Sequence, residues 1–135
     1  GFRSVELLKS QLLLNGKPLV IRGVNRHEHD ARSGHILRRE HMLQDVRRMK
    51  EFNVNAVRNS HYPQHPDWYD LCDEYGLYLV DEANIESHGH FIRNPFATLA
   101  GHPSWREAHL HRTRNMLERN KNHASIIAWS LGNEA

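Results

Sequence analysis

The sequence predicts an α/β fold, namely the first half of a TIM (β/α)₈ barrel with four parallel strands and three helices, preceded by a β-hairpin. Strand-like apolar segments alternate with amphipathic helix-like segments along the 135 residues, and such alternation builds a parallel sheet. Four strands in about 115 residues extrapolate to about eight in the roughly 250 residues of a complete barrel. A flavodoxin-like open sheet is the alternative, but no glycine-rich phosphate loop follows the first strand.

The chain is long enough for about one domain. We expect residues 1–19 to form an N-terminal hairpin that leads into the barrel, and residues 20–135 to supply the first four barrel strands of a partial domain. Two extended runs, 5–14 and 19–24, are joined at Asn15-Gly16. This dipeptide tolerates positive φ at both turn positions and therefore predicts the hairpin.

Three helices are predicted from apolar spacing and from residues typical of helix ends. Apolar side chains recur with the helical period in residues 38–52, at Met42, Leu43, Val46 and Met49. Pro66 and Gly76 are suited to begin and end a second helix. Ser104 with Glu107 three residues later predicts a capping box that begins a third helix, which runs to about residue 120.

The predicted strands, at about 20–24, 53–58, 77–80 and 125–131, share one feature. Polar and ionisable side chains follow the apolar body of each strand, at His27, His61, Glu86, His88, Asn133 and Glu134. In a barrel the carboxyl ends of the strands meet at one face, where such folds carry their active sites. The sequence therefore predicts one site built from four strand ends.

Glu86 and His88 are candidate metal ligands. They are two residues apart, so in an extended chain both side chains leave on the same face. Glu134 from the neighbouring strand could add a third ligand. Donor chemistry alone favours Mn²⁺ or Zn²⁺ over Mg²⁺, because one donor is an imidazole. The alternative is that Glu86 and His88 simply pair with each other in a loop.

Glu134 is a candidate general acid. Trp129 and Leu131 precede it and predict a partly apolar setting, which disfavours the ionised carboxylate. A carboxylic acid held near a second carboxylate is the arrangement that glycosidases use.

Composition argues against two classes of partner. Lys and Arg number 18 against 16 Asp and Glu, too even a balance to predict nucleic acid binding. The longest apolar stretches fall far short of the roughly 20 residues that cross a bilayer, so no membrane span is expected. The single cysteine, Cys72, fits a reducing compartment, and a cytoplasmic location is expected.

Five motifs in one order resemble the β-galactosidases of glycoside hydrolase family 2, of the large bacterial type. They occupy residues 22–29 (RGVNRHEH), 60–63 (SHYP), 71–78 (LCDEYGLY), 81–89 (DEANIESHG) and 129–134 (WSLGNE). The resemblance covers nearly the whole chain. It implies a fragment of the catalytic barrel of a retaining hydrolase, one that cleaves terminal non-reducing β-D-galactose from β-galactosides such as lactose.

The resemblance also implies a role for each matching residue. Glu134 matches the general acid/base, and Asn133 matches the residue that binds the sugar 2-hydroxyl. His27 and His61 match histidines that bind galactosyl hydroxyls. The ligands of the family's active-site Mg²⁺, for which Mn²⁺ can substitute, are matched by Glu86, His88 and Glu134.

The resemblance places other parts of the enzyme outside these residues. The nucleophile, on a later barrel strand, the flanking β-sandwich domains and the monovalent-cation site have no counterpart in this sequence. We therefore expect the isolated chain to be inactive, and the full enzyme to be a homo-oligomer. Two alternatives remain: a zinc-dependent barrel hydrolase that uses His27 and His29, and a sugar-binding fragment without catalysis.

Overall fold

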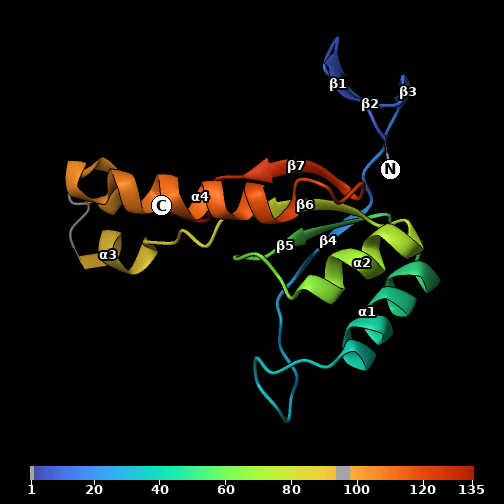
Figure 1. Ribbon diagram of the computed structural model, residues 1–135, viewed down its shortest axis with the longest axis horizontal. Helices are drawn as coiled ribbons and strands as arrows, with labels where there is room; N and C mark the ends of the chain where they lie inside the picture. Colours follow the sequence, from blue (N-terminus) through green and yellow to red (C-terminus); the bar gives the residue numbers. More distant parts are fainter. Residues whose placement is uncertain (1, 94–97) are drawn as a thin grey trace.

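The computed structural model describes residues 2–93 and 98–135. Its main sheet is parallel and consists of β4 (Gly23–Arg26), β5 (Ala56–Asn59), β6 (Tyr78–Glu82) and β7 (Ile126–Ser130). The strands lie in the order of the sequence, β4-β5-β6-β7, as Figure 1 shows. A barrel has this order, whereas a doubly wound sheet reverses direction at a switch point. The predicted half-barrel is therefore confirmed.

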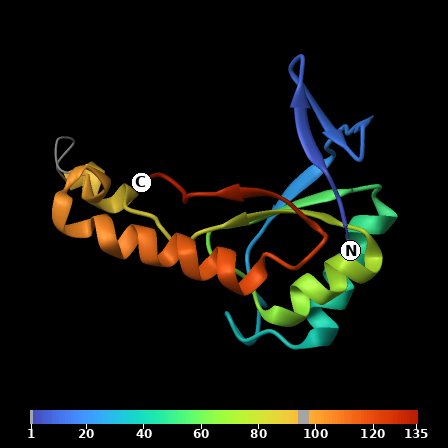
Figure 2. The ribbon, with the colours of Figure 1, turned by 45° about the horizontal axis from the view of Figure 1, so that its top comes forward.

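Three long helices connect these strands and cover one face of the sheet, while the other face stays open (Figure 2). They are α1 (Arg39–Glu51), α2 (Pro66–Tyr75) and α4 (Arg106–Asn120). The core between helices and sheet is formed by apolar side chains from both layers, among them Met42, Val46, Trp68, Leu71, Leu79 and Ile126. Because strand side chains alternate between faces, neighbouring residues such as Val80 point to the uncovered side, which would be the barrel interior.

Asp81 fixes the helices to the covered face of the sheet. Its buried carboxylate accepts hydrogen bonds from Tyr69 Oη of α2 (2.8 Å) and from Asn120 Nδ2 of α4 (2.7 Å). A third bond comes from Asn59 Nδ2 of β5 at 2.9 Å, and Asn59 Oδ1 in turn accepts from Trp68 Nε1. A buried carboxylate with these partners specifies how α2 and α4 pack on β6.

The N-terminal segment is a small antiparallel sheet of β1 (Val5–Leu8), β2 (Gln11–Leu14) and β3 (Lys17–Pro18). The predicted turn at Asn15-Gly16 is present, with φ of 50° and 74°. The predicted first arm over 5–14 is wrong as a single strand, because a second turn at Lys9-Ser10, also with positive φ, folds it into β1 and β2. The predicted second arm over 19–24 is also wrong as a single strand of the hairpin. The hairpin strand β3 ends at Pro18, and the next strand, β4, belongs to the main sheet.

The helix predictions hold for α1 and α2, and differ for the third helix. That helix begins at Arg106, after a 3₁₀ turn over Pro103–Trp105. The predicted capping box is absent, because Ser104 instead bonds the ring of His102 through both its amide and its hydroxyl. A short helix, α3 (His88–Arg93), was not predicted. None of the helices among the described residues is long and apolar enough to span a membrane.

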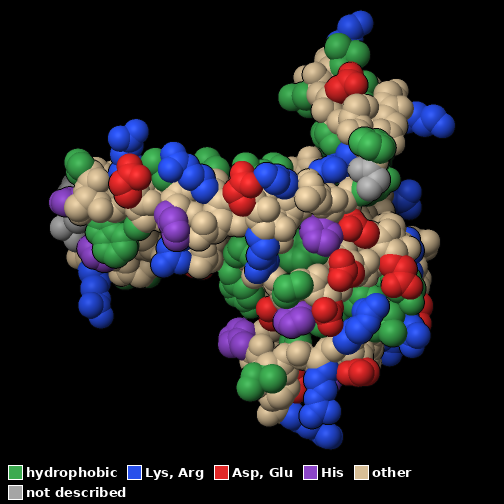
Figure 3. All heavy atoms as spheres, viewed as in Figure 1, with side chains coloured by type: hydrophobic (Ala, Val, Ile, Leu, Met, Phe, Trp, Pro, Cys, Tyr) green, Lys and Arg blue, Asp and Glu red, His purple; other side chains and the backbone are tan. Residues whose placement is uncertain are grey.

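Charged side chains of both signs are mixed over the face of the molecule seen in Figure 3. This mixture agrees with the composition of the whole chain, which has 18 Lys and Arg and 16 Asp and Glu.

Candidate active site

The carboxyl ends of the four parallel strands bring the predicted site residues to one edge of the sheet. His27 directly follows β4, His61 follows β5, and Glu86 follows β6. Asn133 and Glu134 follow β7. The carboxyl ends of parallel strands lie at the same edge, so residues more than 100 positions apart in the chain are brought to that edge together.

Glu82, the last residue of β6, is the centre of this edge. Its side chain is fully buried and faces away from the helices. Arg58 donates to it twice, from Nε to Oε2 at 2.7 Å and from Nη2 to Oε1 at 3.0 Å. Ser130 Oγ donates to Oε2 at 2.7 Å, and His61 Nδ1 lies 2.7 Å from Oε1. The carboxylate therefore joins three residues from β5, β7 and the loop after β5.

The electrostatics of this group follow from its burial and its donors. Burial by itself would raise the pKa of Glu82, but hydrogen bonds from Arg58, Ser130 and His61 outweigh it and hold the pKa below its usual value. Glu82 is thus ionised at neutral pH, and its negative charge is neutralised by the Arg58 guanidinium.

Arg58 connects this buried group to one of the predicted site residues. Its Nη2 donates to Asn133 Oδ1 at 2.9 Å as well as to Glu82. The Asn133 amide nitrogen faces the other way and lies 3.3 Å from Glu86 Oε1. Sequence reasoning missed both Arg58 and Glu82. For Arg58 the available signal was a charged side chain directly after the apolar Ala56 and Val57 of β5, which is costly to bury unless the charge is paired.

Glu86 and Asn133 are joined through their main chains as well. They form a parallel β-bridge beyond the ends of β6 and β7, and the Asn133 amide donates to Ile85 O at 2.8 Å. Gly132 makes this approach possible. Its φ is +145°, and a Cβ there would lie 2.5 Å from Ile85 O. The two loops are therefore held against each other next to Glu134.

Glu134 lies at this edge and pairs with His88, whose Nδ1 is 2.9 Å from Glu134 Oε2. Both side chains are about half exposed. The alternative in which Glu86 and His88 pair with each other is therefore not what the structure has. Of the two residues expected to give Glu134 an apolar setting, Leu131 is 71% exposed and Trp129 packs against the core. Because Glu134 itself is about half exposed, that setting is not formed.

The predicted metal ligands lie at one edge, but the contacts of the described residues join only two of the three to each other. His88 contacts Glu134, and Glu86 contacts Asn133. Among residues 2–93 and 98–135, no group of three or more His, Cys, Asp or Glu side chains is arranged to hold a metal ion. Two carboxylates and an imidazole nevertheless have the donor chemistry that divalent ions accept.

The two predicted sugar-binding histidines are adjacent. The rings of His27 and His61 lie edge to face with centroids 5.0 Å apart. His29, the other member of the zinc alternative, contacts the ring of His35 instead, at 5.8 Å. The described residues thus give the zinc alternative no support.

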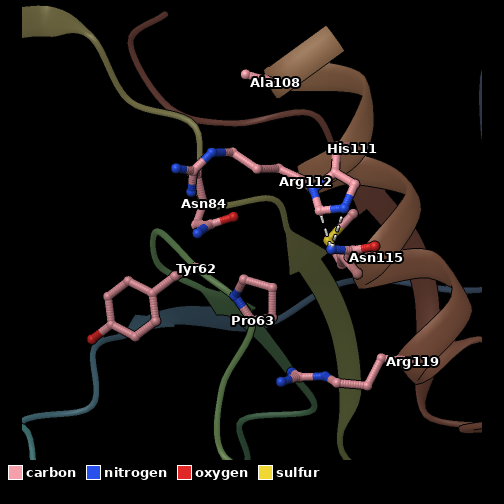
Figure 4. A pocket seen from close by; sticks show the side chains of 9 residues that line it. Tyr62, Pro63, Asn84, Ala108, His111, Arg112, Asn115 and Arg119 are labelled. Atoms are coloured by element: carbon pink, nitrogen blue, oxygen red, sulfur yellow. Dashed lines mark hydrogen bonds between the residues drawn. The ribbon is translucent and has the colours of Figure 1, made fainter.

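A cavity of about 550 Å³ lies elsewhere, between α4 and the loops that follow β5 and β6 (Figure 4). Its lining includes Tyr62, His111, Arg112 and Arg119, and none of the six predicted site residues. The candidate active site is therefore the open edge of the sheet and not this cavity.

Comparison with known proteins gives consistent matches. A family model described as "Glycosyl hydrolases family 2, TIM barrel domain" matches residues 5–135. A beta-galactosidase of Vibrio vulnificus is 56% identical over 135 residues, which are 100% of this chain and 13% of the relative. A beta-galactosidase of Pseudoalteromonas haloplanktis is 59% identical over 134 residues, 99% of this chain and 13% of the relative.

Solved structures of β-glucuronidases are similar to this chain. The apo enzyme of Ruminococcus gnavus superposes with a TM-score of 0.87 at 33% identity, covering 99% of this chain and 23% of that chain. The enzyme of Bifidobacterium dentium complexed with coumarin-3-O-glucuronide gives 0.85 at 33% identity, covering 98% and 20%. The chain therefore spans a small part of every protein it matches here.

Proposed function

Because the chain belongs to glycoside hydrolase family 2, we propose that it is the acid/base-bearing half of the catalytic barrel of a retaining β-galactosidase. The observation that carries the proposal is the pair Asn133 and Glu134 at the end of β7, held to the loop after β6 by the Glu86–Asn133 bridge. The β-galactosidase relatives share 56% and 59% identity, whereas the β-glucuronidases share 33%. This difference favours a terminal non-reducing β-D-galactoside, such as lactose, as the substrate.

Glu134 is the general acid/base of this proposal. As an acid it donates a proton to the departing glycosidic oxygen, and as a carboxylate it then takes a proton from the water that hydrolyses the galactosyl intermediate. Its half-exposed position at the rim supports access to both. A retaining mechanism needs a second carboxyl about 5 to 5.5 Å away, and the family resemblance assigns it to a later barrel strand.

His27, His61 and Asn133 are the proposed galactose-binding residues. The two rings lie side by side at the end of β4 and β5, and imidazole nitrogens both donate to and accept from hydroxyls. Asn133 is next to Glu134 in the chain, which supports a contact with the 2-hydroxyl close to the reacting carbon.

Mg²⁺ is the proposed cofactor, with Glu86, His88 and Glu134 as its ligands and Mn²⁺ as a substitute. The donor chemistry of the three groups supports this. In the described residues His88 contacts Glu134, and Glu86 contacts Asn133. When bound, such an ion supplies positive charge beside the acid/base.

The whole protein's properties are proposals as well. The chain spans 13% of the length of the curated relatives cited above, so we propose that the remaining barrel strands, the nucleophile and the β-sandwich domains lie in the rest of the enzyme. A homo-oligomer in the cytoplasm is proposed for the full protein. The single cysteine supports the location.

The function is tested by replacing the proposed acid in the full-length enzyme. Glu134→Gln removes the proton but keeps the shape, so kcat/KM for lactose should fall about 10³-fold. The fall should be smaller for 4-nitrophenyl β-D-galactoside, because its leaving group needs little protonation. Glu118→Gln, an exposed carboxylate on α4, is the matched control and should match wild type.

Two results would contradict the proposal. One is a wild-type enzyme that hydrolyses 4-nitrophenyl β-D-glucuronide and not the galactoside. The other is a Glu134→Gln variant whose kcat/KM for lactose falls by less than about 10-fold, because removal of an essential general acid should cause a larger loss.

A further inference from the structure

We propose that Glu82 is a positioning residue of the active site, which fixes the ring of His61 and, through Arg58, the amide of Asn133. This inference rests on the proposed function, since His61 and Asn133 are its galactose-binding residues. No role for Glu82 follows from the motif comparison, and the geometry alone assigns one.

The partners of Glu82 distinguish it from an ordinary buried carboxylate of the core. Its neighbour Asp81 bonds Tyr69 and Asn120, which belong to the helices that pack on the sheet. Glu82 is equally buried, yet its bonds go to Arg58, His61 and Ser130, none of which lies on a helix. Asp81 therefore holds layers together, whereas Glu82 holds side chains at the strand ends.

The contact with His61 determines which ring nitrogen is available to a substrate. Because an ionised carboxylate only accepts hydrogen bonds, His61 Nδ1, at 2.7 Å from Glu82 Oε1, must carry the proton. The opposite nitrogen, Nε2, then remains for a sugar hydroxyl. Among the described residues, the other charged or titratable groups in contact with this pair are Arg58, which bonds Glu82, and His27, whose ring lies against that of His61.

The contact with Arg58 determines which end of the Asn133 amide is available. Glu82 holds the guanidinium through two bonds, and Arg58 Nη2 then donates to Asn133 Oδ1 at 2.9 Å. With its oxygen engaged, Asn133 presents Nδ2 at the rim, on the side of Glu86. The buried charge of Glu82 thus determines that Asn133 offers its Nδ2 donor, and that His61 offers its Nε2, to a substrate.

The test compares Glu82→Gln with Asp81→Asn in the full-length enzyme. Glu82→Gln loses the charge that both donors require, so kcat/KM for lactose should fall about 100-fold, with a lower kcat and a higher KM. Asp81→Asn removes an equally buried charge from the opposite face. It should lower Tm but leave kcat/KM within about 3-fold.

A double-mutant cycle with His61→Ala shows whether Glu82 acts through the ring. In the His61→Ala background the loss caused by Glu82→Gln should shrink to about 10-fold, the part that acts through Arg58 and Asn133. Crystal structures of both carboxylate variants give a readout that does not depend on activity. The His61 ring and the Asn133 amide should turn in Glu82→Gln and stay in place in Asp81→Asn.

Each outcome is decisive. Unchanged kinetics with an unmoved His61 and Asn133 in Glu82→Gln would overturn the inference while the wild type still hydrolyses galactosides. A full 100-fold loss in the His61→Ala background would overturn the route through His61. A wild type inactive on galactosides contradicts the proposed function instead, and the crystal structures then still test the positions. If Glu82→Gln does not fold, Glu82→Asp takes its place, because it keeps the charge on a shorter side chain. It should lower kcat/KM for lactose in the same way, but by less than 100-fold.

Discussion

Asp73 links the end of α2 to the segment that leads into β7. Its carboxylate accepts the Ser125 amide at 2.8 Å and lies 2.7 Å from His123 Nδ1. Partial burial would raise the pKa of Asp73, but the bonds from Ser125 and His123 outweigh it and the net pKa is lowered. The ionised form is therefore the one that stabilises the fold.

Asp73→Asn should lower the free energy of unfolding by about 0.5 kcal/mol at pH 7, because Asp73 is partly exposed and water screens its charge. The pKa of Asp73 is lower in the folded state than in the unfolded state, where it is about 3.9. The stabilisation by the ionised carboxylate is therefore fully present above the unfolded-state pKa, and it is lost as the pH falls through the folded-state pKa. Urea unfolding of the full-length protein from pH 7 downward should show the difference from wild type narrowing below about pH 4. Asp70→Asn, an exposed residue of the same helix, is the control. If the stability difference between Asp73→Asn and wild type stayed the same at low pH, the ionised carboxylate would not be its cause.

At the scale of residues, the sequence located the groups that follow the strands and missed those inside them. His27, His61, Asn133 and Glu134 were found because a polar residue after an apolar strand marks the carboxyl end of a barrel strand. Arg58 and Glu82 lie within β5 and β6, where their pairing depends on a strand register that a single sequence does not specify.

Among the elements, the bridge between the ends of β6 and β7 depends on Gly132. Gly132→Ala would place a Cβ 2.5 Å from Ile85 O and 2.9 Å from its Cβ, so one of the two loops must move. The Asn133–Ile85 hydrogen bond and the Glu86–Asn133 bridge should then be lost.

We expect Gly132→Ala to reduce stability by about 2 kcal/mol and to reduce kcat/KM for lactose at least 10-fold. Thermal unfolding and steady-state kinetics of the full-length enzyme measure both effects. Gly89→Ala is the matched control, because an added Cβ there meets no atom within 4 Å. Equal behaviour of the two variants would show that the bridge does not position the site.

Elements with a long repeating pattern were predicted, and short elements set by local contacts were not. The stripe from Met42 to Met49 predicted α1, since four apolar residues fit one helical face. The segment of α3 has no such stripe. The turn at Lys9-Ser10 contains neither glycine nor asparagine. Its residue types therefore did not predict the positive φ of the turn between β1 and β2.

In the half-barrel as a whole, the part of the chain that the structure describes leaves two sheet edges unpaired, at β4 and at β7. Apolar side chains are exposed beside the first of them, where Val20 is 70%, Ile21 47% and Val24 38% exposed. Open edges and exposed apolar surface both favour association.

The isolated 135-residue chain should therefore self-associate. Size-exclusion chromatography with light scattering at tens of micromolar should give oligomers, and Ile21→Lys should shift the distribution toward monomer. Gln11→Lys, on the separate N-terminal sheet, adds the same charge away from the edge and should leave the distribution unchanged. A wild-type chain that is monomeric under these conditions contradicts the prediction.

The adjacent carboxylates of β6 make that strand intolerant of any change in length. Side chains alternate strictly between its two faces, so inserting or deleting one residue would exchange Asp81 and Glu82. The longer acid would then enter the helical layer without room for it, and the shorter one would face Arg58 and His61 without reaching them. Single substitutions along this strand can be tolerated, but a register shift of one residue would damage both the packing of the helices and the active site.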